Sequence, residues 1–210
     1  AVTFDPTPAS GSAAVGTVTA SALEFFDGSA WQPVTAAGVT IAAGATSVQV
    51  RVATVDDAYL EGNESFALTA TVSSGATTAA SAAGTGTISD DIDVTTVSLT
   101  APANVAEGGS ITYTATLTNA AQSPVTVALS NGATIVIAAG TTSGTATVAA
   151  PVDDVYLDGA NVSATITGTS GGDFESLAVN PAPATTAISD TVDTTVVSLS
   201  ATNAVAEGGT

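Results

Sequence analysis

The chain has 210 residues, of which 45% are hydrophobic, and it sets 19 acidic side chains against one basic residue, Arg51, for a formal charge of -18. Because phosphate groups are bound through Lys and Arg, this balance argues against nucleic acids and anionic membrane surfaces as partners. With no His, Cys or Lys, the common catalytic bases and nucleophiles are missing, so we expect no enzyme, no disulfide and no thiolate metal site.

The first part of the chain contains a hairpin signal and then a dense acidic stretch. Asp27-Gly28 separates two short runs, and such a pair favours a type I′ turn, which needs positive φ twice. We expect the aromatic cluster of Phe25, Phe26 and Trp31 to serve packing rather than sugar stacking, and Arg51 to pair with a nearby acid. The stretch TVDDAYLEGNESF at 54–66 then gathers Asp56, Asp57, Glu61 and Glu64 within nine positions.

The next hundred residues show the two-residue hydrophobic period of β-strands. Ile111, Tyr113, Ala115 and Leu117 alternate with threonines, and Asn131-Gly132 predicts a second hairpin between the runs 125–129 and 135–137. Further strands are expected at 162–166 and 185–189, and no stretch has a helical period. About seven short strands per hundred residues predict an all-β fold of antiparallel, immunoglobulin-like β-sandwiches.

Long stretches of the sequence recur at a spacing of about one hundred residues. DVTTVSLTAPANVAEGGS at 93–110 returns as DTTVVSLSATNAVAEGGT at 193–210, and PVDDVYLDGANVS at 151–163 repeats the acidic stretch with Asp153, Asp154 and Asp158. TISDDID at 87–93 returns as AISDTVD at 187–193. We therefore predict a first repeat at 1–91, a second at 92–190 and the truncated start of a third at 191–210.

Strands that alternate in direction would bring three acidic segments of each repeat to one end of its sandwich. In the second repeat these are the AEGG turn with Glu107, the loop with Asp153 and Asp154, and the exit with Asp190. Carboxylates so close repel one another unless protonated or joined by a cation. An all-oxygen donor set favours calcium, with magnesium second, over zinc or copper. A plain solvated surface would spread the charge, yet all but five of the acidic residues lie in the recurring motifs.

DDAYLEGNESF followed by GTGTISDD resembles the Calx-beta domain, a calcium-binding, cadherin-like sandwich. The whole hundred-residue repeat resembles the extender repeats of giant RTX-type biofilm adhesins of Gram-negative bacteria. The resemblance implies calcium ligands in both repeats: Asp56, Asp57, Glu61, Glu64, Asp90 and Asp91 in the first, and Glu107, Asp153, Asp154, Asp158 and Asp190 in the second. Asp93 and Asp193 lie in the linkers and would complete either a site or a junction. The first repeat has no counterpart of Glu107, which predicts a weaker site there.

These features predict a calcium-stabilised extender that holds an adhesive tip away from the cell, with neighbouring repeats of the same chain as partners and no self-association. The adhesin resemblance implies a cell-surface location reached by type I secretion. Two alternatives remain open: a module that binds carbohydrate or peptide, and a surface-layer lattice protein. Tandem carboxylates are more typical of a modular binder than of a glycosidase.

Overall fold

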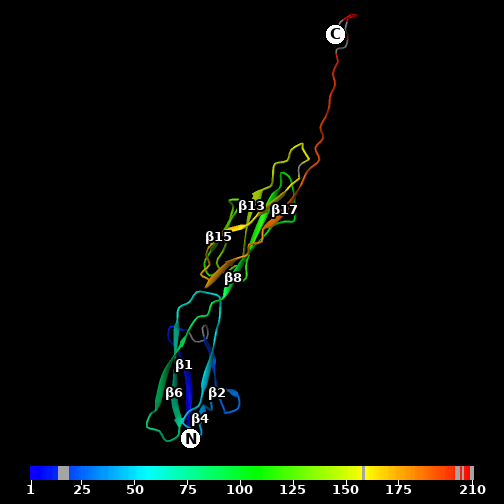
Figure 1. Cartoon of the computed structure of the whole chain (residues 1–210). Helices are drawn as coiled ribbons and strands as arrows, with labels where there is room; N and C mark the ends of the chain where they lie inside the picture. Colours follow the sequence, from blue (N-terminus) through cyan, green and yellow to red (C-terminus); the bar gives the residue numbers. More distant parts are fainter. Residues whose placement is uncertain (14–18, 158, 202–203, 205, 209–210) are drawn as a thin grey trace. The chain divides into compact units, whose positions relative to one another are not determined.

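The computed structural model describes residues 1–210 except 14–18, 158, 202–203, 205 and 209–210 (Figure 1). The described residues form seventeen β-strands and no helix, so none of them belongs to a helix long enough to cross a membrane. Contacts divide the chain into two compact units. Unit 1 comprises Ala1–Thr95 with Asp173–Ser176, and unit 2 comprises Thr96–Gly172 with Leu177–Thr210. The predicted all-β class is confirmed.

Unit 1 is built from two small antiparallel sheets. One has the order β4-β1-β6-β7, with β1 Val2–Ser10, β4 Val39–Ile41, β6 Glu64–Ser74 and β7 Ser81–Ile88. The other has the order β3-β2-β5, with β2 Thr19–Phe26, β3 Trp31–Pro33 and β5 Val50–Thr54. The acidic stretch therefore occupies the connection between β5 and β6. The chain leaves β7 directly into Asp90 and Asp91.

Unit 2 contains three sheets, ordered β13-β10-β8-β16, β12-β11-β15 and β14-β17-β9. Its strands are β8 Val94–Thr100, β9 Asn104–Ala106, β10 Ser110–Leu117, β11 Val125–Leu129, β12 Thr134–Ile137, β13 Ser143–Ala149, β14 Asn161–Ala164, β15 Ile166–Gly171, β16 Ser176–Val179 and β17 Ala184–Ser189. By their contacts, Val94 and Thr95 at the start of β8 and Ser176 at the start of β16 belong to unit 1. These ten strands exceed the predicted seven, and one of the extra strands arises because the run after the acidic loop breaks at Thr165 into β14 and β15, which join different sheets. β10 pairs with β8 and β13, β11 pairs with β12 and β15, and β14 pairs with β17, all antiparallel. β9 and β17 run parallel.

The period-two pattern correctly identifies the interior of unit 2. Tyr113 and Ile111 on β10, and Ile135 and Ile137 on β12, are at most 1% exposed. Among the described residues, the larger fully buried apolar side chains lie in unit 2, apart from Val39. Unit 1 therefore rests on a thinner apolar core than unit 2.

Both predicted hairpins form, but neither contains a type I′ turn. β2 pairs with β3, and β11 pairs with β12. Gly28 and Gly132 have positive φ, whereas Asp27 and Asn131 do not. The side chains of these two residues act as local acceptors instead: Asn131 Oδ1 accepts from Ala133 N at 3.0 Å, and Asp27 Oδ1 accepts from Ser29 N at 2.8 Å. Such Asx turns satisfy the backbone without a second left-handed residue.

Residues 194–200 repeat the sequence of β8 but form no strand. The apolar side chains of Val196, Val197 and Leu199 in this segment are more than 80% exposed.

Candidate metal sites in the acidic loops

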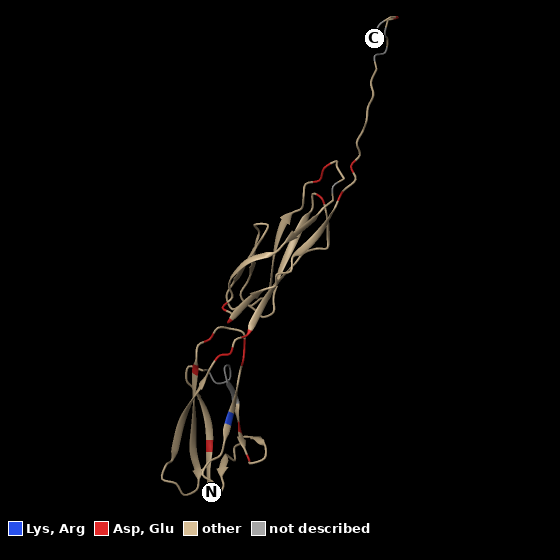
Figure 2. Ribbon diagram, viewed as in Figure 1, with Lys and Arg blue, Asp and Glu red and all other residues tan. Residues whose placement is uncertain are grey.

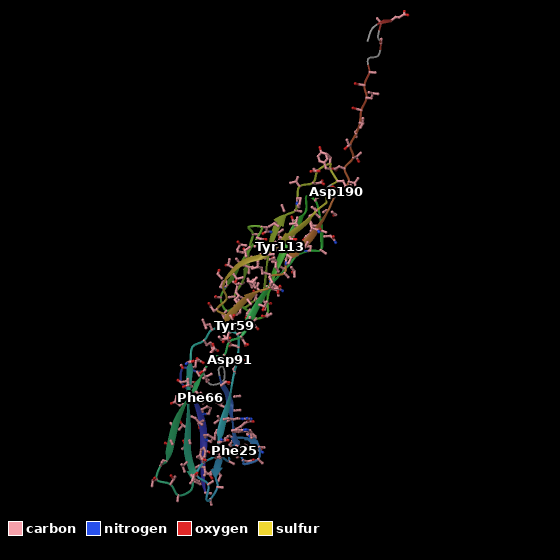
Figure 3. The ribbon with its side chains drawn as sticks, viewed as in Figure 1. Phe25, Tyr59, Phe66, Asp91, Tyr113 and Asp190 are labelled. Atoms are coloured by element: carbon pink, nitrogen blue, oxygen red, sulfur yellow. The ribbon has the colours of Figure 1, made fainter. Side chains whose placement is uncertain are left out.

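The acidic connection of unit 1 folds back onto the segment that follows β7. A cavity of about 260 Å³ is lined by five carboxylates, those of Asp56, Glu61, Glu64, Asp90 and Asp91. Glu61 N donates a hydrogen bond to Asp90 Oδ2 at 3.2 Å, which ties the two segments together. Acidic residues gather in these loops, as the red segments of Figure 2 show, and Asp91 is labelled in Figure 3. The two acidic segments predicted for the first repeat therefore meet.

The proximity of these carboxylates raises the pKa of two of them. The pKa of Asp56 is raised by a hydrogen bond shared with Asp91 and by the negative charges of Asp91 and Asp93. The pKa of Glu61 is raised by burial and by the charges of Asp57, Glu64 and Asp90. Asp57 also fixes the loop, because its Oδ1 accepts from Tyr59 N at 2.9 Å. At neutral pH the loop therefore holds uncompensated negative charge, which a proton or a cation would relieve.

Without metal, mild acidification is expected to stabilise unit 1. A raised pKa means that the folded chain binds protons that the unfolded chain, with ordinary values of 3.8 for Asp and 4.5 for Glu, does not. The gain begins as the pH falls from neutral through the raised values and is complete below the ordinary ones. Asp27 has the opposite effect on stability, but only at lower pH. Hydrogen bonds from Ala30 and Ser29 lower the pKa of Asp27, so the stability that its ionised carboxylate contributes is lost as the pH falls below 3.8.

Melting temperatures in chelator, followed by circular dichroism from about pH 7 down to about pH 4, measure this effect. The Glu61→Gln variant should show a shallower rise than the original chain. In saturating calcium, acidification should instead lower the melting temperature, because protons then compete with the cation for the carboxylates. A melting temperature that falls on acidification in chelator would contradict the arrangement of the loop.

Glu175 was not among the predicted site residues, yet it belongs to the acidic group of unit 1. Its carboxylate accepts a short hydrogen bond from Asp93 N and lies beside Asp90. The hydrogen bond from Asp93 lowers the pKa of Glu175, but burial and the Asp90 carboxyl outweigh it and raise the pKa overall. Glu175 lies between β15 and β16, outside every recurring motif, so only the folded chain shows its position.

In unit 2 the three predicted segments meet where the chain leaves β17. Glu107 N donates to Ser189 O at 3.0 Å, and Gly108 N donates to Pro151 O at 2.7 Å. The Thr191 hydroxyl donates a short hydrogen bond to Asp153 Oδ1. The AEGG turn, the acidic loop and the exit of β17 are thus held by direct contacts, as the strand order predicted.

The side chain of Glu107 and one carboxylate oxygen of Asp190 are withdrawn from water at this end of unit 2. Glu107 is 8% exposed. Asp190, labelled in Figure 3, has a buried Oδ1 atom with no hydrogen-bond partner among the described residues. Asp154 Oδ1 accepts from Tyr156 N at 2.8 Å, which repeats the turn made by Asp57. Asp193 is exposed in the extended segment after β17, and Asp158 lies outside the described residues.

The residues present suit a hard cation in their chemistry. Every candidate donor is oxygen, and a buried carboxylate atom such as Asp190 Oδ1 is stabilised by a positive partner. Among the described residues, however, no three acidic side chains stand together in an arrangement ready to hold a metal ion. Binding would therefore require side-chain rotation in loops that already lie in contact.

The aromatic cluster of the first hairpin is packed as predicted. The guanidinium carbon of Arg51 lies 4.1 Å from the centre of the Trp31 ring, and the Phe26 ring lies 5.6 Å from it. Arg51 also forms an ion pair with Glu24 at 2.6 Å, which confirms its predicted pairing. The Trp31 ring is thus engaged by neighbours of its own chain and is not a bare stacking platform.

Residues 93–191, just under half of the chain, match the LapA domain family, a family of biofilm adhesins. No curated protein matches the chain. The matched range spans β8 to β17 and ends immediately after Asp190. It therefore includes all three segments that meet at the end of unit 2.

Proposed function

We propose that this chain, with its LapA domain at 93–191, is a calcium-stabilised spacer of a cell-surface adhesin. In this role the repeats supply length, and a different part of the adhesin supplies the adhesive contact. Export by type I secretion, with folding outside the cell where calcium is available, belongs to the same proposal. The LapA match and the all-β fold support the adhesin part, while the calcium part rests on the acidic loops.

The observation that carries the calcium proposal is the convergence of acidic segments in both units. In unit 1 five carboxylates line one cavity, and the pKa of Asp56 and of Glu61 is raised. In unit 2 Glu107 and Asp190 each place carboxylate oxygens out of water. Holding such groups together costs stability unless a cation compensates them, so ion binding becomes part of the folding free energy.

The residues that would hold calcium differ between the units. In unit 1 they are Asp56, Glu61, Glu64, Asp90 and Asp91, with Glu175 as an addition. In unit 2 they are Glu107, Asp153 and Asp190, beside Thr191. A bound ion would supply positive charge only, while these side chains would orient its oxygen shell and fix the loops that carry them.

Isothermal titration calorimetry of the chelator-treated chain tests the proposal directly. Calcium should bind saturably, and magnesium should bind more weakly because it sheds its waters reluctantly and needs stricter geometry. The Glu61→Gln and Glu107→Gln variants should each lose part of the calcium heat, whereas Glu24→Gln, which removes a carboxylate elsewhere, should not. Equal heats for the two ions, or no saturable heat at all, would reject the calcium spacer.

A further inference from the structure

The acidic loop of unit 1 is covered by a short segment that follows β15 in the sequence. Asp173–Ser176 belongs to unit 1 by its contacts. The Phe174 ring stacks on the Tyr59 ring, with centroids 6.1 Å apart and planes 19° from parallel. Two backbone hydrogen bonds flank the stack, from Leu60 N to Asp173 O at 3.1 Å and from Glu175 N to Ala58 O at 3.3 Å. The segment Asp173–Ser176 therefore contacts both the backbone of the acidic loop and its Tyr59 ring.

The covering segment has a backbone shape that few sequences can adopt. Gly171, Gly172 and Asp173 have positive φ values of 87°, 98° and 57°. A Cβ atom on Gly171 would lie 2.2 Å from Pro124 O, so only glycine fits there. Three consecutive left-handed residues turn the chain out of β15 and present Phe174.

The corresponding loop of the second repeat has the same turn, but no described segment covers it. DDVYLDG corresponds to DDAYLEG, and Asp154 accepts from Tyr156 N as Asp57 accepts from Tyr59 N. Val155 is 62% exposed and Tyr156 is 71% exposed. Ala58, at the position of Val155, is only 7% exposed. The second loop thus presents to solvent the surface that the first loop buries.

We propose that Val155 and Tyr156 form a docking surface for a second copy of the Gly171–Glu175 segment, supplied by a following repeat. Residues 193–210 repeat residues 93–110, so the chain itself contains the opening sequence of such a repeat. The occupant is a Gly-Gly-Asp-Phe-Glu turn that stacks its phenylalanine on Tyr156 and exchanges two backbone hydrogen bonds with the loop. This docking goes beyond the proposed spacer role and stands on the contacts of unit 1, independently of calcium.

Disulfide tethering tests this docking, and the absence of native cysteine makes the readout clean. The probe is a peptide with the sequence of residues 170–177 carrying Ser176→Cys, and the target is the full chain carrying Val155→Cys. Under weakly reducing exchange, mixed-disulfide yield should exceed that at Val136→Cys by about tenfold. Val136 is a matched control because it is an exposed valine, 58% exposed, on β12.

Two further variants separate docking from simple thiol reactivity. A peptide carrying Phe174→Ala, and a Val155→Cys chain carrying Tyr156→Ala, should both reduce the yield to the Val136→Cys level. The higher yield at Val155→Cys should be seen in chelator as well as in calcium, so that failure of docking is distinct from failure of calcium binding. Equal yields at the two valine positions, or yields that ignore Phe174→Ala, would overturn the proposal.

Discussion

Calcium is expected to raise the melting temperature of unit 1 by about 10–20 °C above its value in chelator. An ion at about one hundred times its dissociation constant stabilises the folded state by about 2.7 kcal/mol, and about 1 kcal/mol shifts the melting temperature of a domain this small by about 4–8 °C. Unit 1 depends more on the ion because, among the described residues, Val39 is its one large fully buried aliphatic side chain. Circular dichroism melts in chelator, calcium and magnesium measure the shift.

In chelator we expect unit 1 to unfold before unit 2, which keeps the buried cluster around Tyr113 and Ile135. Calcium should bring the two transitions closer together, and magnesium at the same concentration should do so much less. A melting curve that calcium does not move would show that the acidic loops are only solvated.

The Glu107→Gln substitution is expected to stabilise unit 2 slightly in chelator and to destabilise it in calcium. In chelator it removes the cost of burying the charge of a carboxylate that is 8% exposed, so unit 2 should gain some stability. In calcium the same change removes a charged ligand and should cancel most of the calcium increment, about 2.7 kcal/mol at one hundred times the dissociation constant. The measurement is a pair of urea titrations, with and without calcium, on each protein.

Glu24→Gln serves as the control, because it also removes one carboxylate but from the exposed pair with Arg51 in unit 1. Its effect on the unit 2 transition should be small and equal in both buffers. If Glu107→Gln destabilises unit 2 equally with and without calcium, the carboxylate has a structural role that no ion shares.

The core of unit 2 could be predicted from the sequence because strand geometry is local. Side chains of a strand point alternately to opposite faces, so the pattern around Tyr113 identifies buried positions without knowledge of the neighbouring strands. The two hairpins could also be predicted from the sequence, because Asp27-Gly28 and Asn131-Gly132 are typical turn pairs. Their turn type was not, because it depended on competition between a left-handed backbone and a side-chain acceptor at Asp27 and Asn131.

The candidate sites were only partly predictable for a related reason. Glu107 and Asp153 could be assigned to one end of a sandwich because strand alternation fixes where connections lie. Glu175 could not, since it reaches Asp93 through a turn that depends on Gly171 and Gly172. Thr191 carries no carboxylate that would mark it in the sequence as part of a site, yet its hydroxyl donates a hydrogen bond to Asp153. Such contacts depend on tertiary structure that no local pattern encodes.

The parallel pairing of β9 with β17 determines how unit 2 would respond to tension. β9 lies near the point where the chain enters the unit, and β17 ends where the chain leaves it, with Asn104 opposite Ala187 and Ala106 opposite Ser189. A pull on both sides of the unit draws these strands in opposite directions along their own axes. Their hydrogen bonds are then loaded together in shear instead of opening one after another. Rupture under load is governed by the unfolding rate, so this strand pair would slow the unfolding of unit 2 when the chain is pulled from both sides of the unit.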